Sequence, residues 1–468
     1  MSTAPTTTTA EAPPPDAPAP SSRRWAPLRP LILRLHFYAG VLIAPFLLVA
    51  ATTGFLYAGS FQAEKIIYSK EMTVPVGDRK LPISQQVAAA RTSYPEGDIA
   101  AIRPSATDDA STRVMLSGVK GVESDRTLAV FVDPYTAEVR GALEQYGSSA
   151  ALPVRTWIDR FHRDLLLGES GRLYSELAAS WLWVVALGGV VLWFSRRRAL
   201  RKVRGTTGRR RTLGLHGTVG VWAAIGFVFL SATGLTWSTY TGANIAELRT
   251  SLGQETPSVS AAVGAGHEGH GGGGGTASGD VGGVSLDKVL AAARAQGLSN
   301  PVEIVPPADA KSAYVVKQIQ AQWPTKADSV AIAPATGQVT DTLRFDDYPV
   351  LAKLTRWGID LHTGVLFGLV NQIALMALTL ALILLIVWGY RLWWQRGRGS
   401  SFGRPIPRGA WRQVPPLILV PLVAVVAAVG YFVPLLGITL AAFVVLDIAV
   451  GAVARRRGKA APAEAGQA

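Results

Sequence analysis

Six apolar stretches, each about as long as a bilayer is thick, constrain the fold of this chain more than any other feature. They cover roughly residues 34–58, 174–195, 213–238, 363–394, 414–433 and 435–453. An apolar run of about 20 residues is long enough to cross the hydrocarbon core as a helix. Each run must be helical, because lipid offers the backbone no hydrogen-bond partner. The sequence therefore predicts an integral membrane protein, mainly α-helical, with six transmembrane helices.

Basic residues gather between these runs and indicate their orientation. The segment 196–211 holds nine Arg and Lys residues and no acid, and residues 391–412 are also basic and free of acids. Further basic clusters lie at 23–34 and 455–457. Because positively charged loops stay on the inner side, we expect both termini and the loop 199–211 to be cytoplasmic, in a multi-pass protein of the cell membrane. This topology explains the net charge of +14 without a nucleic acid partner.

The N-terminal segment and the absence of cysteine exclude several classes of protein. Residues 1–26 are rich in Thr, Ala and Pro, so we expect a disordered cytoplasmic tail and not a cleaved signal peptide. The chain contains no cysteine. This excludes disulfides, thiolate metal sites and haem attached through Cys-x-x-Cys-His.

Four histidines occur at matching places in two copies of one unit. His36 opens the first apolar run and His216 opens the third, at an offset of 180 residues. His162 and His362 precede the second and fourth runs, at an offset of 200 residues. The residues around them match as well: Thr53-Gly54 with Thr233-Gly234, Trp157 with Trp357, Leu166 with Leu366, and Gly168 with Gly368.

The long segments 60–155 and 239–355 resemble two versions of one small α+β module outside the cytoplasm. Each has a helical pattern, at 85–91 and 286–294, followed by residues that alternate as strands do. The expected strands are Thr112–Leu116 and Leu128–Val132 in the first module, and Ala313–Lys317 and Ser329–Ile332 in the second.

These observations predict a duplicated helix–module–helix unit. The first repeat covers 31–198 and the second 212–396, and a C-terminal hairpin with a basic cytoplasmic tail occupies 397–468. Both repeats start on the cytoplasmic side, so a pseudo-two-fold axis along the membrane normal relates them. We therefore expect His36 and His216 to lie together near the cytoplasmic face, and His162 and His362 together near the outer face.

Paired imidazoles between membrane helices favour a shared metal centre. Polar side chains at membrane depth are costly and usually carry function. Two opposed imidazoles fill both axial positions of a haem iron, which suits electron transfer. The alternative for any one of these histidines is an interfacial residue that only forms hydrogen bonds. Nearby arginines are candidates to neutralise haem propionates: Arg34, Arg211, Arg160, Arg163 and Arg356.

Two further sets of residues bear on this hypothesis. Ligands at opposite ends of a span are separated by roughly 30 Å, and the aromatic side chains of Trp183, Trp222 and Phe227 are candidates to fill that gap. The remaining histidines, His267 and His270, lie in the Gly-rich stretch 264–283. They could capture a metal transiently, but a Gly-rich chain offers no fixed geometry, so a flexible linker is favoured.

The motif Leu35-His36-Phe37-Tyr38-Ala39-Gly40, the Thr53-Gly54 end and Leu361-His362-Thr363-Gly364 resemble the PepSY-associated transmembrane protein family over residues 31–396. The two outer modules resemble PepSY domains. The resemblance implies a link to iron uptake, two b-type haems, axial ligation by His36, His162, His216 and His362, and reduction of ferric siderophores. Gly217 departs from the bulkier residue that the family has after the third-span histidine.

We therefore expect a haem-binding membrane oxidoreductase that passes electrons across the membrane to an extracytoplasmic ferric chelate. No Gly-x-Gly-x-x-Gly follows a predicted strand, so the electron donor is expected to be a quinol or a separate protein. Two alternatives stay open. The PepSY-like modules could bind peptides or inhibit proteases with the helices as a mere anchor, or the chain could be a transporter. The spans offer no buried acid–base pairs of the kind that a transporter uses.

Overall fold

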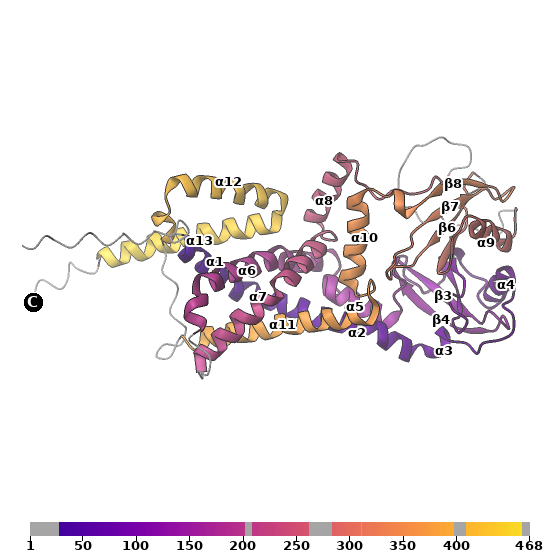
Figure 1. Cartoon of the computed structure of the whole chain (residues 1–468), viewed down its shortest axis with the longest axis horizontal. Helices are drawn as coiled ribbons and strands as arrows, with labels where there is room; N and C mark the ends of the chain where they lie inside the picture. The colour runs from indigo at the N-terminus through magenta and orange to yellow at the C-terminus, as the bar shows by residue number, and fades with distance from the viewer. Residues whose placement is uncertain (1–27, 202–207, 262–282, 310, 397–408, 461–468) are drawn as a thin grey trace, which may run out of the picture.

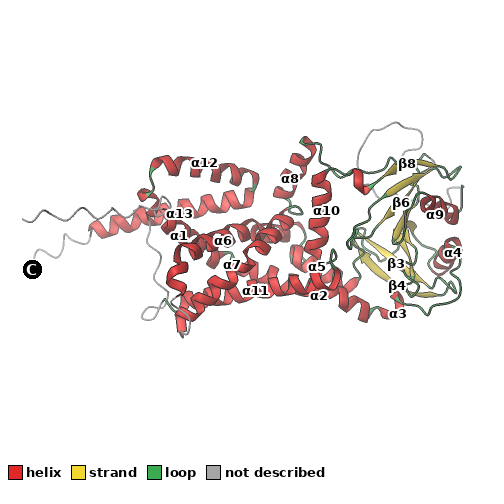
Figure 2. Ribbon diagram, in the orientation of Figure 1, coloured by secondary structure: helices red, strands yellow, loops and turns green. Residues whose placement is uncertain are grey.

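The computed structural model describes residues 28–201, 208–261, 283–309, 311–396 and 409–460. The molecule is elongated, with a helical body at one end and a β-sheet at the other (Figures 1 and 2). The predicted tail 1–26, the segment 202–207 of the basic loop, the linker stretch 264–282 with His267 and His270, and residues 461–468 lie outside the described residues.

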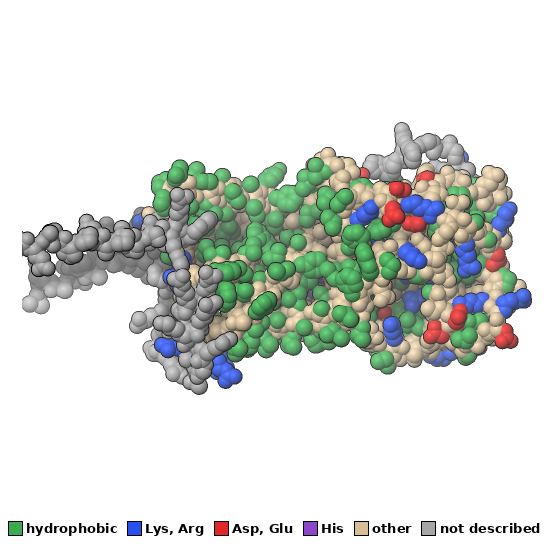
Figure 3. Space-filling view, viewed as in Figure 1, with side chains coloured by type: hydrophobic (Ala, Val, Ile, Leu, Met, Phe, Trp, Pro, Cys, Tyr) green, Lys and Arg blue, Asp and Glu red, His purple; other side chains and the backbone are tan. Residues whose placement is uncertain are grey.

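The helical body confirms a multi-pass membrane protein. Within the described residues, five helices are long and apolar enough to cross a membrane. They are α2 (Ala44–Ile67), α6 (Glu169–Arg201), α7 (Gly208–Leu235), α11 (Gly368–Trp394) and α13 (Pro434–Ala460). The apolar helix α12 (Pro416–Phe432) has 17 residues, so it rises only about 25 Å, and the sixth crossing stays a prediction. Hydrophobic side chains cover the visible face of the body, whereas charged ones gather at the sheet (Figure 3).

The first predicted span is in fact two helices. Helix α1 (Arg29–Leu42) is separated from α2 by Ile43, and α2 continues nine residues past the predicted end, to Ile67. Pro45 lies in the first turn of α2, where its missing N–H breaks no helical hydrogen bond. His36 therefore lies on the short helix α1, which packs against α6.

The two outer segments together form one eight-stranded sheet, and each of the two predicted modules contributes four of its strands. The strand order is β4-β3-β2-β1-β5-β6-β7-β8, all antiparallel. The halves join where β1 pairs with β5 at Ile102 and Ile304. Pairing these two strands removes an open edge from each half. The strands are β1 (Asp98–Arg103), β2 (Thr112–Ser117), β3 (Arg126–Val132), β4 (Val139–Tyr146), β5 (Val302–Val305), β6 (Tyr314–Gln318), β7 (Ser329–Ile332) and β8 (Val339–Leu343).

One hydrophobic core serves both halves of the sheet. Helices α4 (Ile83–Ser93) and α9 (Leu286–Ala295) cover the side of the sheet that faces away from the helical body (Figure 1). Ile102, Val289 and Ile304 are all fully buried in this core. Both helices and the four predicted strands are confirmed. The sequence analysis missed β1, β4, β5 and β8.

The remaining helices connect the sheet to the spans. Helices α8 and α10 run across the long axis between the body and the sheet (Figure 1). These connecting elements are α3 (Ser69–Met72), α5 (Pro153–Asp164), α8 (Tyr240–Ser251), α10 (Val350–Thr363) and the 3₁₀ helix Phe345–Asp347, and a second 3₁₀ helix, Ala410–Gln413, precedes α12.

The C-terminal hairpin is attached to the first half by polar contacts. Trp181 Nε1 donates to Thr439 Oγ1 at 2.9 Å, and Arg34 on α1 pairs with Asp447 on α13. Asp447 is the one acid in the sixth predicted span, and Arg34 is only 6% exposed. A buried charge of this kind needs its partner. Arg34 is thus part of the hairpin attachment, and its pairing with a haem propionate stays a prediction.

An ion pair at the β1–β5 junction gives a first testable prediction. Glu303 accepts from Arg103 at 2.7 Å and lies 2.8 Å from Lys317 Nζ. Burial raises the pKa of Glu303, but Arg103 and Lys317 outweigh it, so the pKa is held below its usual value. The pair therefore stabilises the fold at neutral pH, and this contribution is lost as the pH falls through the lowered pKa. We expect Glu303→Gln to cost about 2 kcal/mol at pH 7.

Thermal unfolding of the purified protein in detergent checks this prediction. The difference in Tm between the parent and Glu303→Gln should be clear at neutral pH and should shrink in acid, because protonation neutralises the parent carboxylate as well. A difference that is the same at both pH values would show that the charge of Glu303 is not what holds the junction.

Candidate functional site

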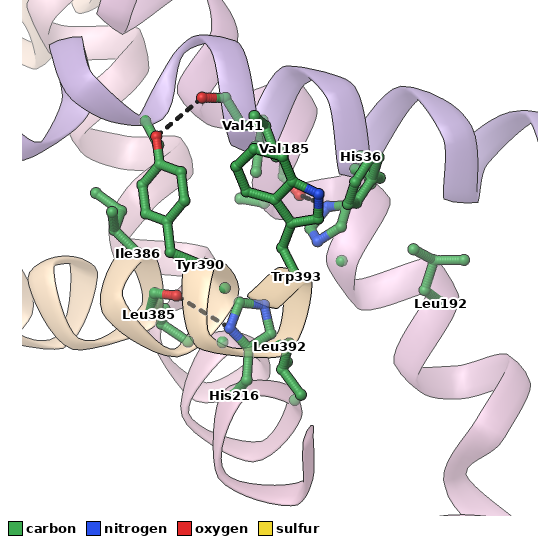
Figure 4. Close-up of a pocket in the computed structure, with 18 of the residues that line it drawn as sticks. His36, Val41, Val185, Leu192, His216, Leu385, Ile386, Tyr390, Leu392 and Trp393 are labelled. Carbon is green, nitrogen blue, oxygen red and sulfur yellow. Dashed lines mark hydrogen bonds between the residues drawn. The ribbon is translucent and has the colours of Figure 1, made fainter. Parts of the chain in front are cut away.

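His36 and His216 meet inside the helical body. His36 lies on α1 and His216 on α7, and their ring centres are 6.3 Å apart with the ring planes at 79°. The two rings face one another across a pocket between the helices (Figure 4). Both rings are half-buried, because each has one side on the pocket. The expected association of these two residues is therefore observed.

A backbone carbonyl fixes the orientation of each inner imidazole. His36 Nδ1 lies 2.9 Å from the carbonyl oxygen of Val185 on α6, and His216 Nδ1 lies 3.1 Å from that of Leu385 on α11. A carbonyl only accepts, so in each ring Nδ1 carries the proton and donates. The Nε2 lone pair is then free. This is the arrangement that orients metal-binding histidines in proteins.

The pocket between these rings has a volume of about 240 Å³ and is lined by residues of α1, α2, α6, α7 and α11. Glycines leave room beside the imidazoles: a Cβ on Gly189 would lie 3.1 Å from His36 Cε1, and one on Gly389 would lie 3.8 Å from His216 Cε1. Gly217 also lines the pocket. The absence of a side chain at Gly217, where a bulkier residue was expected, therefore enlarges the pocket. The flat walls are aromatic and come from Phe37, Trp193, Tyr390 and Trp393.

Two arginines that the sequence analysis did not single out line the same pocket. They are Arg209, at the start of α7, and Arg396, just after α11. In the sequence, only their position in the basic segments 196–211 and 391–412 distinguished these two arginines. Those segments indicated the topology of the chain and not a binding site. Of the arginines that were proposed, Arg160, Arg163 and Arg356 pair with acids of the outer part, and Arg211 is exposed.

His162 and His362 each bind a threonine on a spanning helix. His162 Nδ1 lies 2.8 Å from Thr53 Oγ1 on α2, and His362 Nδ1 lies 2.6 Å from Thr233 Oγ1 on α7. Each hydroxyl has one proton and already donates it to its own helix, to the carbonyls of Val49 and Phe229 respectively. The hydroxyls must therefore accept from Nδ1–H. Nε2 is again the free nitrogen in both rings.

The outer histidines lie on short helices before their spans. His162 is on α5, which ends where Leu165 adopts a left-handed conformation, and His362 is on α10, which ends at Gly364. This corrects the span predicted over 363–394, because α11 starts only at Gly368. The ion pair of Glu64 and Arg155, 2.9 Å apart, holds α5 against α2.

Burial keeps both outer imidazoles neutral. It lowers the pKa of His162 to about 4 and that of His362 to about 3, where the neighbouring His162 adds to the effect. Neutral imidazole is the form that binds metals. Glycine again leaves space beside one ring, since a Cβ on Gly54 would lie 3.3 Å from His162 Cε1. Trp237 packs edge-on against His362, with ring centres 5.3 Å apart.

The inner and outer pairs are separated along α7. From His216 to Thr233, which binds His362, the helix rises about 25 Å. Phe227 lies between them and is buried, as expected of a residue in the gap. Trp222 is 84% exposed and faces away from the bundle, so it does not fill the gap. Among the described residues, no group of three or more His, Cys, Asp or Glu side chains could hold a metal ion.

The fold and this geometry define a multi-pass membrane protein with imidazoles presented in pairs between its helices and a sheet domain at one end. The family model for the PepSY-associated TM region matches residues 33–396, and the chain belongs to this family. The match covers both predicted repeats and ends before the C-terminal hairpin. None of the curated proteins matches the chain.

Proposed function

We propose that this protein holds two b-type haems and carries electrons across the cytoplasmic membrane to a ferric chelate on the outer side. His36 and His216 would be the axial ligands of the inner haem, and His162 and His362 those of the outer haem. The proposal includes six spans, four in the duplicated unit and two in the C-terminal hairpin, with both termini in the cytoplasm and the sheet outside it. A quinol or a separate protein is the proposed electron donor.

The observation that carries this proposal is the separation of the inner rings. Imidazole nitrogens bind first-row metal ions at about 2.0 Å, and the ring centre lies about 1.2 Å further back, so two opposed ligands of one ion have ring centres about 6.4 Å apart. The observed separation is 6.3 Å. The free Nε2 atoms, the glycines beside the rings and the aromatic walls also fit a flat macrocycle.

The chain's residues have distinct parts in this function. A haem iron with two imidazole ligands gains and loses one electron without an open position for oxygen. The carbonyls of Val185 and Leu385 would keep the inner imidazoles in the tautomer that can bind iron, and Arg209 and Arg396, which line the pocket, would pair with propionates. The apolar helices exclude water from the space between the pairs. The family's association with iron uptake supports a ferric siderophore as the acceptor.

A visible spectrum of the purified protein tests the proposal. The reduced-minus-oxidised difference should show bis-histidine b-type haem, with about two haems per chain. A colourless protein, purified from cells supplied with haem, would contradict it. That result would favour the alternative in which the helices anchor a PepSY sheet that binds peptides or inhibits proteases.

A further inference from the structure

Two tryptophans at equivalent positions in the halves have different surroundings. Trp157 on α5 is 54% exposed and stacks on Phe161, with ring centres 5.4 Å apart. Trp357 on α10 is half-buried, and Trp323 packs on it at 5.7 Å. The backbone N–H of Trp323 donates to the Leu366 carbonyl at 2.8 Å. The loop between β6 and β7 thus covers Trp357 in the second half of the chain. In the first half, the equivalent Trp157 is open to solvent.

Glu123 takes the place of Trp323 in the first half, at the same offset of 200 residues. Its carboxylate lies 3.1 Å from a guanidinium nitrogen of Arg126 and 3.5 Å from one of Arg160. The Glu123 side chain is 60% exposed, so it can leave this position easily. Because the two guanidiniums bind this carboxylate, the same position can bind an anionic oxygen of a ligand.

Arg160 has capacity for a further acceptor. The Nε atom of Arg160 is buried and has no hydrogen-bond partner among the described residues, whereas Arg126 Nε lies 3.8 Å from an Asp125 carboxylate oxygen and Arg126 Nη1 donates to Glu144 at 2.6 Å. A buried donor without a partner is costly, so it indicates a missing acceptor. In the second half the equivalent residues are Lys326 and Asp360. The pair of guanidiniums is therefore particular to the first half.

A cavity of about 160 Å³ lies at this place, between the sheet and α5. It is lined by Arg126, Glu144, Thr156, Trp157, Arg160 and Leu166, and we call it the α5 cleft. The exposed indole offers a flat apolar wall, and the arginines offer paired donors to oxygen. Binding pockets for small molecules commonly combine an apolar wall with a few convergent polar groups.

We propose that the α5 cleft binds an oxygen-rich anionic chelate, whose oxygens displace the Glu123 carboxylate from Arg126 and Arg160 and whose apolar part lies on Trp157. Trp157 precedes His162 by five residues, a rise of about 7.5 Å along α5. The cleft is therefore next to the outer pair. That the α5 cleft is the site of the electron acceptor rests on the proposed function. The binding of an anion in this cleft does not depend on that function.

Equilibrium dialysis with radiolabelled iron tests the proposal on the full chain in detergent. The probes are ferric citrate, which is anionic, and ferric tris(maltolate), which is uncharged. Arg160→Gln should weaken the binding of ferric citrate about tenfold, and Glu123→Gln should strengthen it about threefold, because it removes a competing carboxylate. Arg160→Lys should keep part of the affinity. The affinity for the uncharged probe should change little.

Lys326→Gln is the matched control, since it removes one positive charge at the equivalent place in the covered half. It should leave the binding of ferric citrate unchanged. Equal binding by Arg160→Gln and the parent, or equal weakening by Lys326→Gln, would overturn the proposal. A folding defect cannot mimic the expected pattern, because Glu123→Gln must gain affinity. Haem content is measured on the same samples, so a protein that binds ferric citrate without haem would contradict the proposed function and leave the cleft intact.

Discussion

The double substitution His36→Ala/His216→Ala is expected to lower the haem content from about two to about one per chain. The inner pocket would keep its walls but lose both nitrogens that we propose as iron ligands. Electron transfer across the membrane should fall to background, because the outer pair lies about 25 Å from the emptied site along α7. The measurements are a haem-to-protein ratio, a difference spectrum, and reduction of external ferric citrate by proteoliposomes that hold a reduced donor inside.

The chain supplies a matched control for this experiment. His267→Ala/His270→Ala also removes two imidazoles, from the Gly-rich stretch 264–283, and should change neither the spectrum nor the transfer. If the His36→Ala/His216→Ala protein kept both haems, the assignment of these two histidines as ligands would be wrong. The protein would still be a haem protein.

Replacing Thr53 with valine should weaken the proposed outer haem site while leaving the proposed inner site intact. Valine matches the shape of threonine but cannot accept the Nδ1–H of His162, so the buried imidazole loses the partner that fixes its tautomer. Losing such a partner typically costs 10- to 100-fold, or about 1.4–2.8 kcal/mol, in metal affinity. The measurement is the rate of haem loss from each site to an excess of apomyoglobin, followed by the two spectral components.

Thr52→Val serves as the control for this prediction. Thr52 is the adjacent residue, is exposed, and donates only to the Leu48 carbonyl of its own helix. The same change of side chain there should leave both components in place. If Thr52→Val and Thr53→Val lost the outer haem at the same rate, the hydrogen bond to His162 would have no part in holding it.

Much of the candidate site followed from spacing and topology. The two offsets paired His36 with His216 and His162 with His362, and the positive-inside pattern put each pair at one depth. The structure brings His36 and His216 to 6.3 Å and places His162 near enough to affect the pKa of His362. Hydropathy also located the five helices that are long and apolar enough to cross a membrane, because long apolar runs have one solution in lipid.

The sequence did not reveal the groups that orient the histidines. Val185 and Leu385 act through backbone carbonyls, which every residue has, so no side-chain pattern marks them. Thr53 and Thr233 were noted only as the ends of spans. Their role depends on which face of α2 and α7 meets the short helices, and helix packing decides that.

Local sequence determined the spans of this protein, its orientation signals and the repeated histidines, because these depend on the cost of placing each residue in water or lipid. The tertiary structure alone decided that the outer halves form one sheet, that Arg34 pairs with Asp447, and that Trp323 covers the second half while Glu123 leaves the first half open. These outcomes depend on contacts between residues up to 413 positions apart. Such contacts exist only after the helices and strands have packed.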